Sequence, residues 1–404
     1  MPVNLPPLGK LERVPGFRWG SSEAEIRYTG RTDLAVMACV EGTVVGGVYT
    51  KNRFTAAPVL VCKEHKGPLR GVVVNSGNAN AATGQRGLDD AGESCRLLAS
   101  QLGCKPDEVL PFSTGVIGEF LPMEQVAQGI EKAVSELSDD GWEAAAQAIM
   151  TTDTQPKGFS HSFEVQGKRV TTTGIVKGAG MIRPDMATML AFQATDACMS
   201  EPVANQLVQD LTARSFNRLT VDGDTSTNDS YIVAASGLAN HSVITETNSD
   251  SYRELLDGMS VVARKLAEFT VRDAEGATKF VTITVKGGRT EEECLAVAFT
   301  IAHSPLVKTA LFAGDPNWGR FCMAIGRSAI DDLNPDLVSL WLDEVQIAKN
   351  GLVADSYVET DAAEVMAKDE FEVIADLGRG RATAQVLTSD FSYEYVKINA
   401  EYRT

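Results

Sequence analysis

Hydrophobic residues along this chain follow two periods, one typical of strands and one typical of helices. Short runs rich in β-branched residues and bounded by turn residues predict strands over 34–40 and 71–75. Residues 280–285 alternate between apolar and polar side chains before two glycines, which predicts a half-buried strand that enters a turn.

Four further segments have apolar residues three or four positions apart, the period of an amphipathic helix. Gly103 follows the first segment at the place of a C-terminal cap, Pro122 precedes the second, and Ser200 precedes the third as a predicted N-cap. Strands and helices are therefore mixed along the chain, without a repeat or a linker, and the expected fold class is α/β. The apolar residues of the four segments are Ala91, Cys95, Leu98 and Leu102; Val126, Ile130, Val134 and Leu137; Val203, Leu207 and Leu211; and Leu255, Met259, Val262, Ala263 and Leu266.

Charge and composition argue against several classes of partner. The chain has 404 residues, enough for one large α/β domain or two to three ordinary ones, and a formal net charge of -17. Because nucleic-acid backbones are bound by clustered Lys and Arg, we expect no nucleic-acid partner. No run approaches the roughly 18 apolar residues that span a bilayer, and residues 1–20 lack the apolar core of a secretory signal, so no membrane partner is expected. Seven cysteines, an odd number without a C-x-x-C pair, suit reduced thiols in a cytoplasmic protein.

The scarcity of histidine argues against a hydrolase that pairs a serine or cysteine nucleophile with a histidine base. The chain has four histidines, none in a recognisable nucleophile motif, and G-x-S-x-G is absent. Cys62 and His65 have a metal-like spacing, but no second ligand pair follows, so a structural role is expected for both. Neither a phosphate-binding G-x-x-x-x-G-K-[ST] loop nor a complete G-x-G-x-x-G motif occurs. We therefore expect neither a metal nor a cofactor.

Loops rich in glycine and hydroxyl groups remain as candidates for a site. Glycine lets the backbone turn tightly or approach a ligand, and several such loops in one chain suggest a site built from loops. They are residues 75–84, 113–118, 151–154, 177–192, 222–229 and 314–320.

One of these loops contains a possible self-activating nucleophile. A threonine at a newly made N-terminus can use its own α-amino group, with a pKa of about 8, as general base. Thr188 follows the small Ala187, and Gly178, Gly180 and Pro184 precede it, which suits attack of its hydroxyl on the preceding carbonyl. An ordinary strand threonine would give the same local pattern, so these residues alone make Thr188 only a candidate.

The segment KGAGMIRPDMATMLAF at 177–192 resembles the self-processing site of the ornithine acetyltransferase (glutamate N-acetyltransferase) family of arginine biosynthesis. The resemblance covers nearly the whole chain, because motifs in the same order continue it on both sides. They are NSGNANA at 75–81, STGVIGE at 113–119, MTTDT at 150–154, DGDTSTND at 222–229, EGATK at 275–279, SPLVKTA at 304–310, DPNWGR at 315–320 and the closing NAEYRT.

The resemblance implies an αββα sandwich of the ornithine acetyltransferase and DmpA-like type, cut between Ala187 and Thr188. An α chain of residues 1–187 and a β chain of residues 188–404 would stay together, typically as an α2β2 assembly. Thr188 would then accept the acetyl group. Thr114 and Gly115 would form the oxyanion hole, a role that a hydroxyl and a backbone N–H can fill.

The implied substrate contacts are Thr151, Lys177, Thr188, Glu275, Asn399 and Thr404. Lys177 suits a substrate carboxylate and Glu275 suits an amine. Asn399 and Thr404 imply a C-terminal tail docked over the site, whereas DPNWGR and DGDTSTND would be structural loops near it. The choice of Thr151 over Thr152 or Thr154 follows the resemblance alone.

The implied reaction is transfer of the acetyl group of N-acetylornithine to glutamate through acetyl-Thr188, with acetyl-CoA left open as a second donor. Two other classes also stay open. One is an aminopeptidase or amidase with a self-processed N-terminal nucleophile on a similar fold, and the other is a catalytically silent protein that binds amino acids.

Overall fold

The computed structural model of the protein describes residues 2–183 and 189–401, and the chain divides into two compact units. The large unit comprises Pro7–Asn217 and Asp224–Thr270. The small unit comprises the described parts of Met1–Pro6, Arg218–Gly223 and Val271–Thr404.

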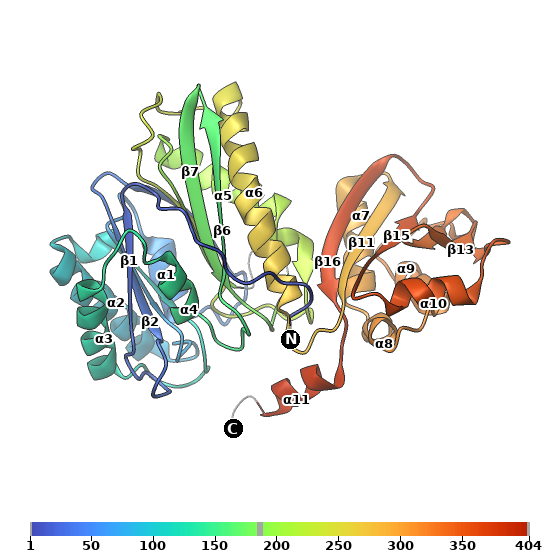
Figure 1. Ribbon diagram of the computed structural model, residues 1–404, viewed down its shortest axis with the longest axis horizontal. Coiled ribbons are helices and arrows are strands. Elements are labelled where there is room, and N and C mark those ends of the chain that lie inside the picture. The colour runs from blue at the N-terminus through green and yellow to red at the C-terminus, as the bar shows by residue number, and fades with distance from the viewer. Residues whose placement is uncertain (1, 184–188, 402–404) are drawn as a thin grey trace. The chain divides into compact units, whose positions relative to one another are not determined.

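Two sheets form the centre of the large unit (Figure 1). The first sheet has the strand order β1-β2-β4-β5, and the second has the order β3-β10-β8-β7-β6. The strands are β1 (Phe17–Ser22), β2 (Leu34–Cys39), β4 (Gly71–Asn75) and β5 (Val109–Ser113), then β3 (Val44–Tyr49), β10 (Ser230–Ala235), β8 (Leu190–Thr195), β7 (Lys168–Lys177) and β6 (Lys157–Val165).

Apolar side chains from both sheets fill the space between them. Phe192 of β8 lies edge-on against Phe112 of β5 and Trp19 of β1, with ring centroids 5.0 and 5.7 Å away. All three rings belong to one buried cluster with residues of β2, β4, β7 and β10. The two sheets therefore pack face to face.

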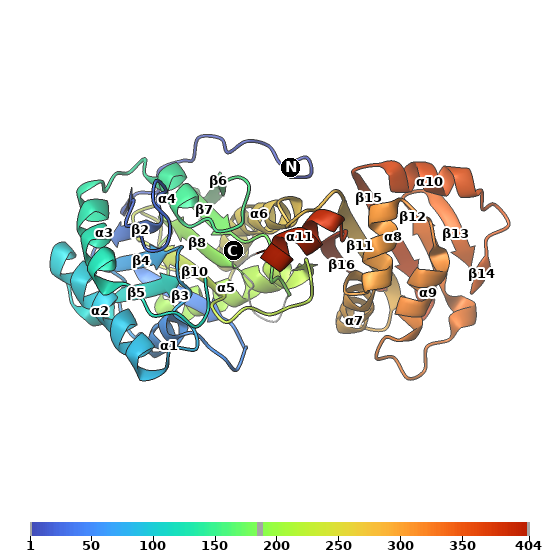
Figure 2. The ribbon, with the colours of Figure 1, turned by 90° about the horizontal axis from the view of Figure 1, so that it is seen from below.

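Helices cover the outer face of each sheet (Figure 2). Leu98 of α2 (Gly84–Leu102) and Ile130 of α3 (Met123–Ser135) share a core with Val73 of the first sheet. On the second sheet, a Cβ at Gly174 of β7 would lie 2.8 Å from Leu266, so glycine lets helix α6 approach closely. The layers run helix, sheet, sheet, helix, and the predicted αββα sandwich is confirmed. The remaining helices of the unit are α1 (Ala57–Glu64), α4 (Trp142–Ala148), α5 (Glu201–Arg214) and α6 (Asp250–Arg272).

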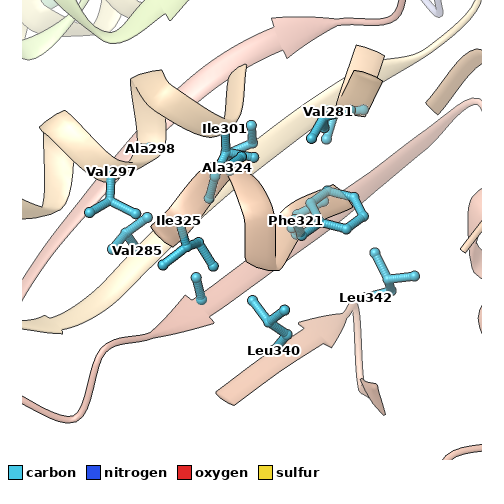
Figure 3. Close-up of a cluster of buried hydrophobic side chains, with 14 of the residues drawn as sticks. Val281, Val285, Val297, Ala298, Ile301, Phe321, Ala324, Ile325, Leu340 and Leu342 are labelled. Atoms are coloured by element: carbon cyan, nitrogen blue, oxygen red, sulfur yellow. The ribbon is translucent and has the colours of Figure 1, made fainter. Parts of the chain in front are cut away.

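The small unit has a seven-stranded sheet with the order β14-β13-β12-β15-β11-β16-β9. Figure 3 shows its core, in which Val297 and Ile301 of α7 and Phe321 of α9 lie with Val281 of β11 and Leu342 of β12. The strands are β9 (Leu219–Thr220), β11 (Phe280–Gly288), β12 (Ser339–Leu342), β13 (Val345–Lys349), β14 (Leu352–Val353), β15 (Glu370–Asp376) and β16 (Ala382–Ser389). The helices are α7 (Glu291–Ala302), α8 (Pro305–Ala313), α9 (Trp318–Gly326), α10 (Glu359–Ala367) and α11 (Tyr393–Glu401).

The predicted strands and helices are confirmed as β2, β4, β11, α2, α3, α5 and α6, with three corrections. Helix α3 ends at Ser135, before Leu137, because Ser138 and Trp19 exchange backbone hydrogen bonds of 2.9 and 3.0 Å that draw the chain toward β1. Ser200 occupies the N-cap position of α5, but its side chain makes no capping hydrogen bond. Strand β11 continues to Gly288 because its pairing with β16 resumes after a bulge.

Two earlier expectations are not decided by the fold. The bond between residues 187 and 188 lies outside the described residues, so the fragments 1–187 and 188–404 remain a prediction, and they do not coincide with the two compact units. In the described part of the chain, no single helix has both the length and the apolar character of a membrane span. Helices α7 and α8 meet these two criteria only when they are taken together, and this pair is bent by 62°.

Candidate active site

The predicted oxyanion hole lies where two parallel strands end. Strands β4 and β5 are neighbours, with Asn75 paired to Ser113, so their carboxyl ends lie at the same edge of the first sheet. Thr114 follows β5 directly, and its backbone N–H donates to the carbonyl oxygen of Asn75 at 2.9 Å. Thr114 is therefore held against the loop that follows β4.

Asn78 joins this loop to the one after β5. It forms bridges with Thr114 and with Val116, and its Nδ2 donates to the carbonyl oxygens of Glu119 at 3.3 Å and Phe120 at 3.1 Å. Its exposed fraction is only 4%. A buried amide with two backbone acceptors is satisfied, so its role here is to connect the two loops.

Position 115 requires glycine for two reasons, its backbone conformation and the close approach of a neighbouring loop. Its φ is +133°, in a region that side-chain-bearing residues rarely adopt. A Cβ at this position would lie 2.6 Å from the carbonyl carbon of Gly77 and 2.7 Å from the backbone nitrogen of Asn78. The backbone of Gly115 can therefore approach the neighbouring loop only because it has no side chain.

Asn228 extends the network to the hydroxyl-rich loop before β10. Its buried Nδ2 donates to the carbonyl oxygens of Ala79 at 2.6 Å and Ser113 at 2.9 Å. Two residues later, the N–H of Ser230 donates to the carbonyl oxygen of Met189 at 2.9 Å. A short series of hydrogen bonds therefore joins the residue before Thr114 to the residue after position 188.

The second cluster surrounds a buried carboxylate at the ends of β6 and β7. Asp153 Oδ1 accepts from Lys157 Nζ at 2.5 Å and from Gly178 N–H at 2.7 Å, while its Oδ2 accepts from Thr151 N–H at 2.9 Å. Lys177 Nζ donates to Thr151 Oγ1 at 3.3 Å. The predicted substrate residues Thr151 and Lys177 thus lie together.

The electrostatics of this cluster favour an ionised Asp153. Burial alone would raise its pKa, but the charges of Lys157 and Lys177, followed by the hydrogen bonds from Lys157 and Thr151, hold the pKa below its ordinary value. The cluster therefore contains two lysine cations and one carboxylate, which leaves an excess of positive charge for an anionic ligand.

The small unit brings Glu275 and Asn399 together. Asn399 Nδ2 donates to Glu275 Oε2 at 2.8 Å, and Ser392 Oγ donates to the carbonyl oxygen of Gly276 at 2.6 Å. Gly276 has a φ of +63°, and a Cβ there would lie 2.4 Å from the backbone nitrogen of Tyr395. The EGATK turn and helix α11 therefore pack tightly against each other.

Asp390 holds this turn, and Lys308 binds the strand end that precedes Asp390. Asp390 accepts from the backbone N–H and the hydroxyl of Thr278, and from the N–H of Lys279. Lys308 is fully buried and donates to Thr388 Oγ1 at 2.9 Å and to the carbonyl oxygen of Ser389 at 2.7 Å. Burial lowers the pKa of Lys308 to about 7, although nearby acidic groups oppose that shift.

The predicted residues thus fall into three groups. Thr114 and Gly115 form one cluster and Thr151 and Lys177 another in the large unit, while Glu275 and Asn399 meet in the small unit. Ala187, Thr188 and Thr404 lie outside the described residues. Asn78, Asn228, Asp153 and Lys157 are further residues of these clusters that the sequence did not identify as site residues. The first three lie within quoted motifs, whereas Lys157 had no signal.

The large unit is thus an αββα sandwich with paired loops at the ends of its strands and a buried carboxylate held between lysines. The particular family follows from comparison with known proteins. The ArgJ family model matches residues 18–404, and the chain belongs to the ArgJ family. The predicted transferase of arginine biosynthesis is confirmed at this level.

The chain is similar to curated ArgJ proteins over its full length. It is 50% identical to the arginine biosynthesis bifunctional protein ArgJ of Pseudomonas syringae pv. tomato and 48% identical to that of Pseudomonas fluorescens, with 100% of both chains covered in each comparison. Among solved structures, the Bacillus halodurans ArgJ protein is 34% identical, with a TM-score of 0.51; the match covers 53% of this chain and 100% of that one.

Proposed function

We propose that this chain is a self-processing acetyltransferase that transfers the acetyl group of N2-acetyl-L-ornithine to L-glutamate, giving N-acetylglutamate and ornithine. The main observation in support is the network from Thr114 through Ser113 and Asn228 to Met189. It connects the proposed oxyanion hole to the residue that follows the proposed nucleophile, Thr188.

The first step is cleavage of the chain before Thr188. Its hydroxyl oxygen attacks the carbonyl carbon of Ala187 and loses its proton. The C–N bond breaks, and the amide nitrogen takes up a proton and becomes the free α-amine. Water then hydrolyses the resulting ester, which leaves a carboxylate on Ala187 and a free hydroxyl on Thr188.

The second step is a ping-pong transfer. The α-amine of Thr188 accepts the hydroxyl proton, and the oxygen attacks the acetyl carbonyl of N-acetylornithine. The hydroxyl of Thr114 and the N–H of Gly115 stabilise the oxyanion, a role in which each donor contributes about 10²–10³ in rate. The amine of ornithine leaves with a proton. The amine of glutamate then attacks acetyl-Thr188, the ester C–O bond breaks, and the proton lost by the amine returns to the Thr188 oxygen.

The lysine cluster supports recognition of the carboxylate that both substrates share. Lys177 supplies the cation and Thr151 a neighbouring hydroxyl, 3.3 Å from it. Glu275, with Asn399 and Thr404, binds a substrate amine. The same proposal includes an α2β2 assembly in the cytoplasm, no resident cofactor, and acetyl-CoA as a second donor. Donor choice is tested by assays of glutamate with each donor separately.

A denaturing gel and an acetyl-transfer assay test this function. The wild-type chain of 43.3 kDa should appear as two fragments of roughly half that size, and Thr188→Ala should stay whole and transfer no acetyl group. Ornithine should be released without glutamate in a burst equal to the amount of enzyme. An intact chain with full activity would refute the proposal. If the enzyme hydrolysed its substrate and did not transfer the acyl group to glutamate when glutamate is present, the aminopeptidase or amidase class would be favoured.

A further inference from the structure

Asp153 is a buried carboxylate of the large unit whose oxygens both accept hydrogen bonds. Its side chain has an exposed fraction of 0%, and so does that of Lys157. Both carboxylate oxygens are occupied, by one ammonium group and two backbone N–H groups. Neither residue was assigned a role in the acetyl transfer described above.

The contacts of Asp153 lead directly to the proposed substrate residues. Thr151 N–H is held by Oδ2, and Gly178 N–H, next to Lys177, is held by Oδ1. The hydrogen bond from Lys177 Nζ to Thr151 Oγ1 closes the ring. A shift of the carboxylate would therefore move both the ammonium and the hydroxyl.

The strand register explains how one carboxylate reaches both segments. Asp153 lies four residues before Lys157, at the start of β6, and Lys157 is paired with Val176 near the end of β7. Lys177 ends β7 and is paired with Leu190 at the start of β8. Asp153 therefore joins the loop before β6 to the turn that leaves β7.

We propose that Asp153, with Lys157 as its buried counter-charge, is a positioning residue for amino-acid substrates: it directs the Lys177 ammonium and the Thr151 hydroxyl toward the substrate carboxylate. This inference rests on the proposed function. Asp153 does not touch the substrate itself, since its oxygens are occupied by the protein. It acts through the two groups that it holds.

A purely structural role for the pair makes a different prediction. Removing one partner of a buried ion pair leaves an unpaired charge and destabilises a protein strongly, whereas replacing both partners by uncharged residues is often neutral. If the pair only stabilised the fold, the double replacement Asp153→Asn with Lys157→Met would restore substrate affinity along with stability. A positioning role predicts that stability returns and affinity does not.

The experiment compares wild type, D153N, K157M and the double variant, with D140N as control. Asp140 pairs with Arg13 at the surface of the same unit, where its side chain is 46% exposed, so D140N changes an ion pair away from the cluster. Three quantities are measured on the full chain: melting temperature, the processed fraction on a denaturing gel, and the Kd of L-ornithine by calorimetry, expressed per processed protein.

We expect K157M and D153N to melt lower than wild type and the double variant to recover most of that loss. The Kd of ornithine should rise roughly ten- to a hundredfold in D153N and in the double variant, the size expected when a hydrogen bond to a charged group is lost. D140N should match wild type in all three quantities. The KM for acetylornithine should rise in parallel where the enzyme turns over.

Each contrary result has a separate meaning. A double variant with the wild-type Kd would overturn the positioning role, as would a folded double variant that is not cleaved at all. A wild-type protein that binds ornithine more tightly than the double variant, but transfers no acetyl group, would refute the proposed function and leave the positioning role standing. A wild-type protein that does not bind ornithine would refute both.

Discussion

Replacing Gly115 by alanine tests the proposed oxyanion hole most directly. At a φ of +133° the side chain strains the backbone, at a cost of about 1–3 kcal/mol. The new Cβ would also lie 2.6–2.7 Å from backbone atoms of Gly77 and Asn78, where ordinary contact begins at 3.4 Å. The loop must therefore move by about 0.7–0.8 Å, and the N–H of residue 115 moves with it.

A displacement of this size predicts a loss of rate larger than the loss of stability. A misplaced or missing oxyanion donor costs about 10²–10³ in kcat, so G115A should keep its fold but lose at least about a hundredfold in acetyl transfer. The assay is kcat with acetylornithine and glutamate, beside the urea midpoint of the same preparation.

Gly118 provides the matched control, because it lies in the same loop with a φ of +86° and has open space around its absent Cβ. G118A should lose stability from strain alone, by about 1–2 kcal/mol, with little change in kcat. If G115A and G118A lost the same activity, the loop would matter only for stability, and the assignment of the Gly115 N–H as an oxyanion donor would be wrong.

Two further replacements test the supports of the candidate site. Asn228→Leu leaves the carbonyl oxygens of Ala79 and Ser113 without their donor, so the free energy of unfolding, measured in urea, should fall by about 2–5 kcal/mol, and an unchanged midpoint would contradict this. The pKa of Lys308 is about 7 in the folded protein, compared with 10.5 for an ordinary lysine. Between these two pH values the unfolded chain binds one more proton than the folded chain, so the free energy of unfolding of wild type rises with pH. Relative to K308M, that gain should be about 1.4 kcal/mol for each pH unit in urea unfolding between pH 7.5 and 9.5, and a difference independent of pH would refute it.

Individual strands and helices of the large unit were predicted from the sequence because their signals are local, whereas the αββα layers were expected only from the family resemblance. The apolar stripe of α2 and the β-branched run of β4 each lie within one element, and a periodic pattern is enough to identify them. Where a contact with a residue far away in the sequence decides where an element ends, the local pattern gave the wrong boundary. The end of α3 is set by hydrogen bonds between Ser138 and Trp19, which are far apart in the chain.

The candidate site shows the same division. Thr114, Gly115, Thr151 and Lys177 were named from motifs, but their partners could not be named because the contacts join segments far apart in sequence. Asn228 is 115 residues from Ser113, and Asp153 is 25 residues from Gly178. Nothing near Lys157 in the sequence indicates a buried ion pair, since the burial of its side chain depends on how β6 and β7 pack.

The sheet order explains why a cut before residue 188 would leave the site assembled. In the second sheet, β8 and β10 of the proposed β chain lie between β3 and β7 of the proposed α chain, with continuous pairing on both sides. Separating the fragments would break both pairings and expose the core around Phe192. Strand β8 is also interior to the sheet, with Leu190 paired to both Lys177 and Ser230. A nucleophile just before β8 would therefore gain a free amine from cleavage, while the first residue of β8 stays hydrogen-bonded into the sheet on both of its sides.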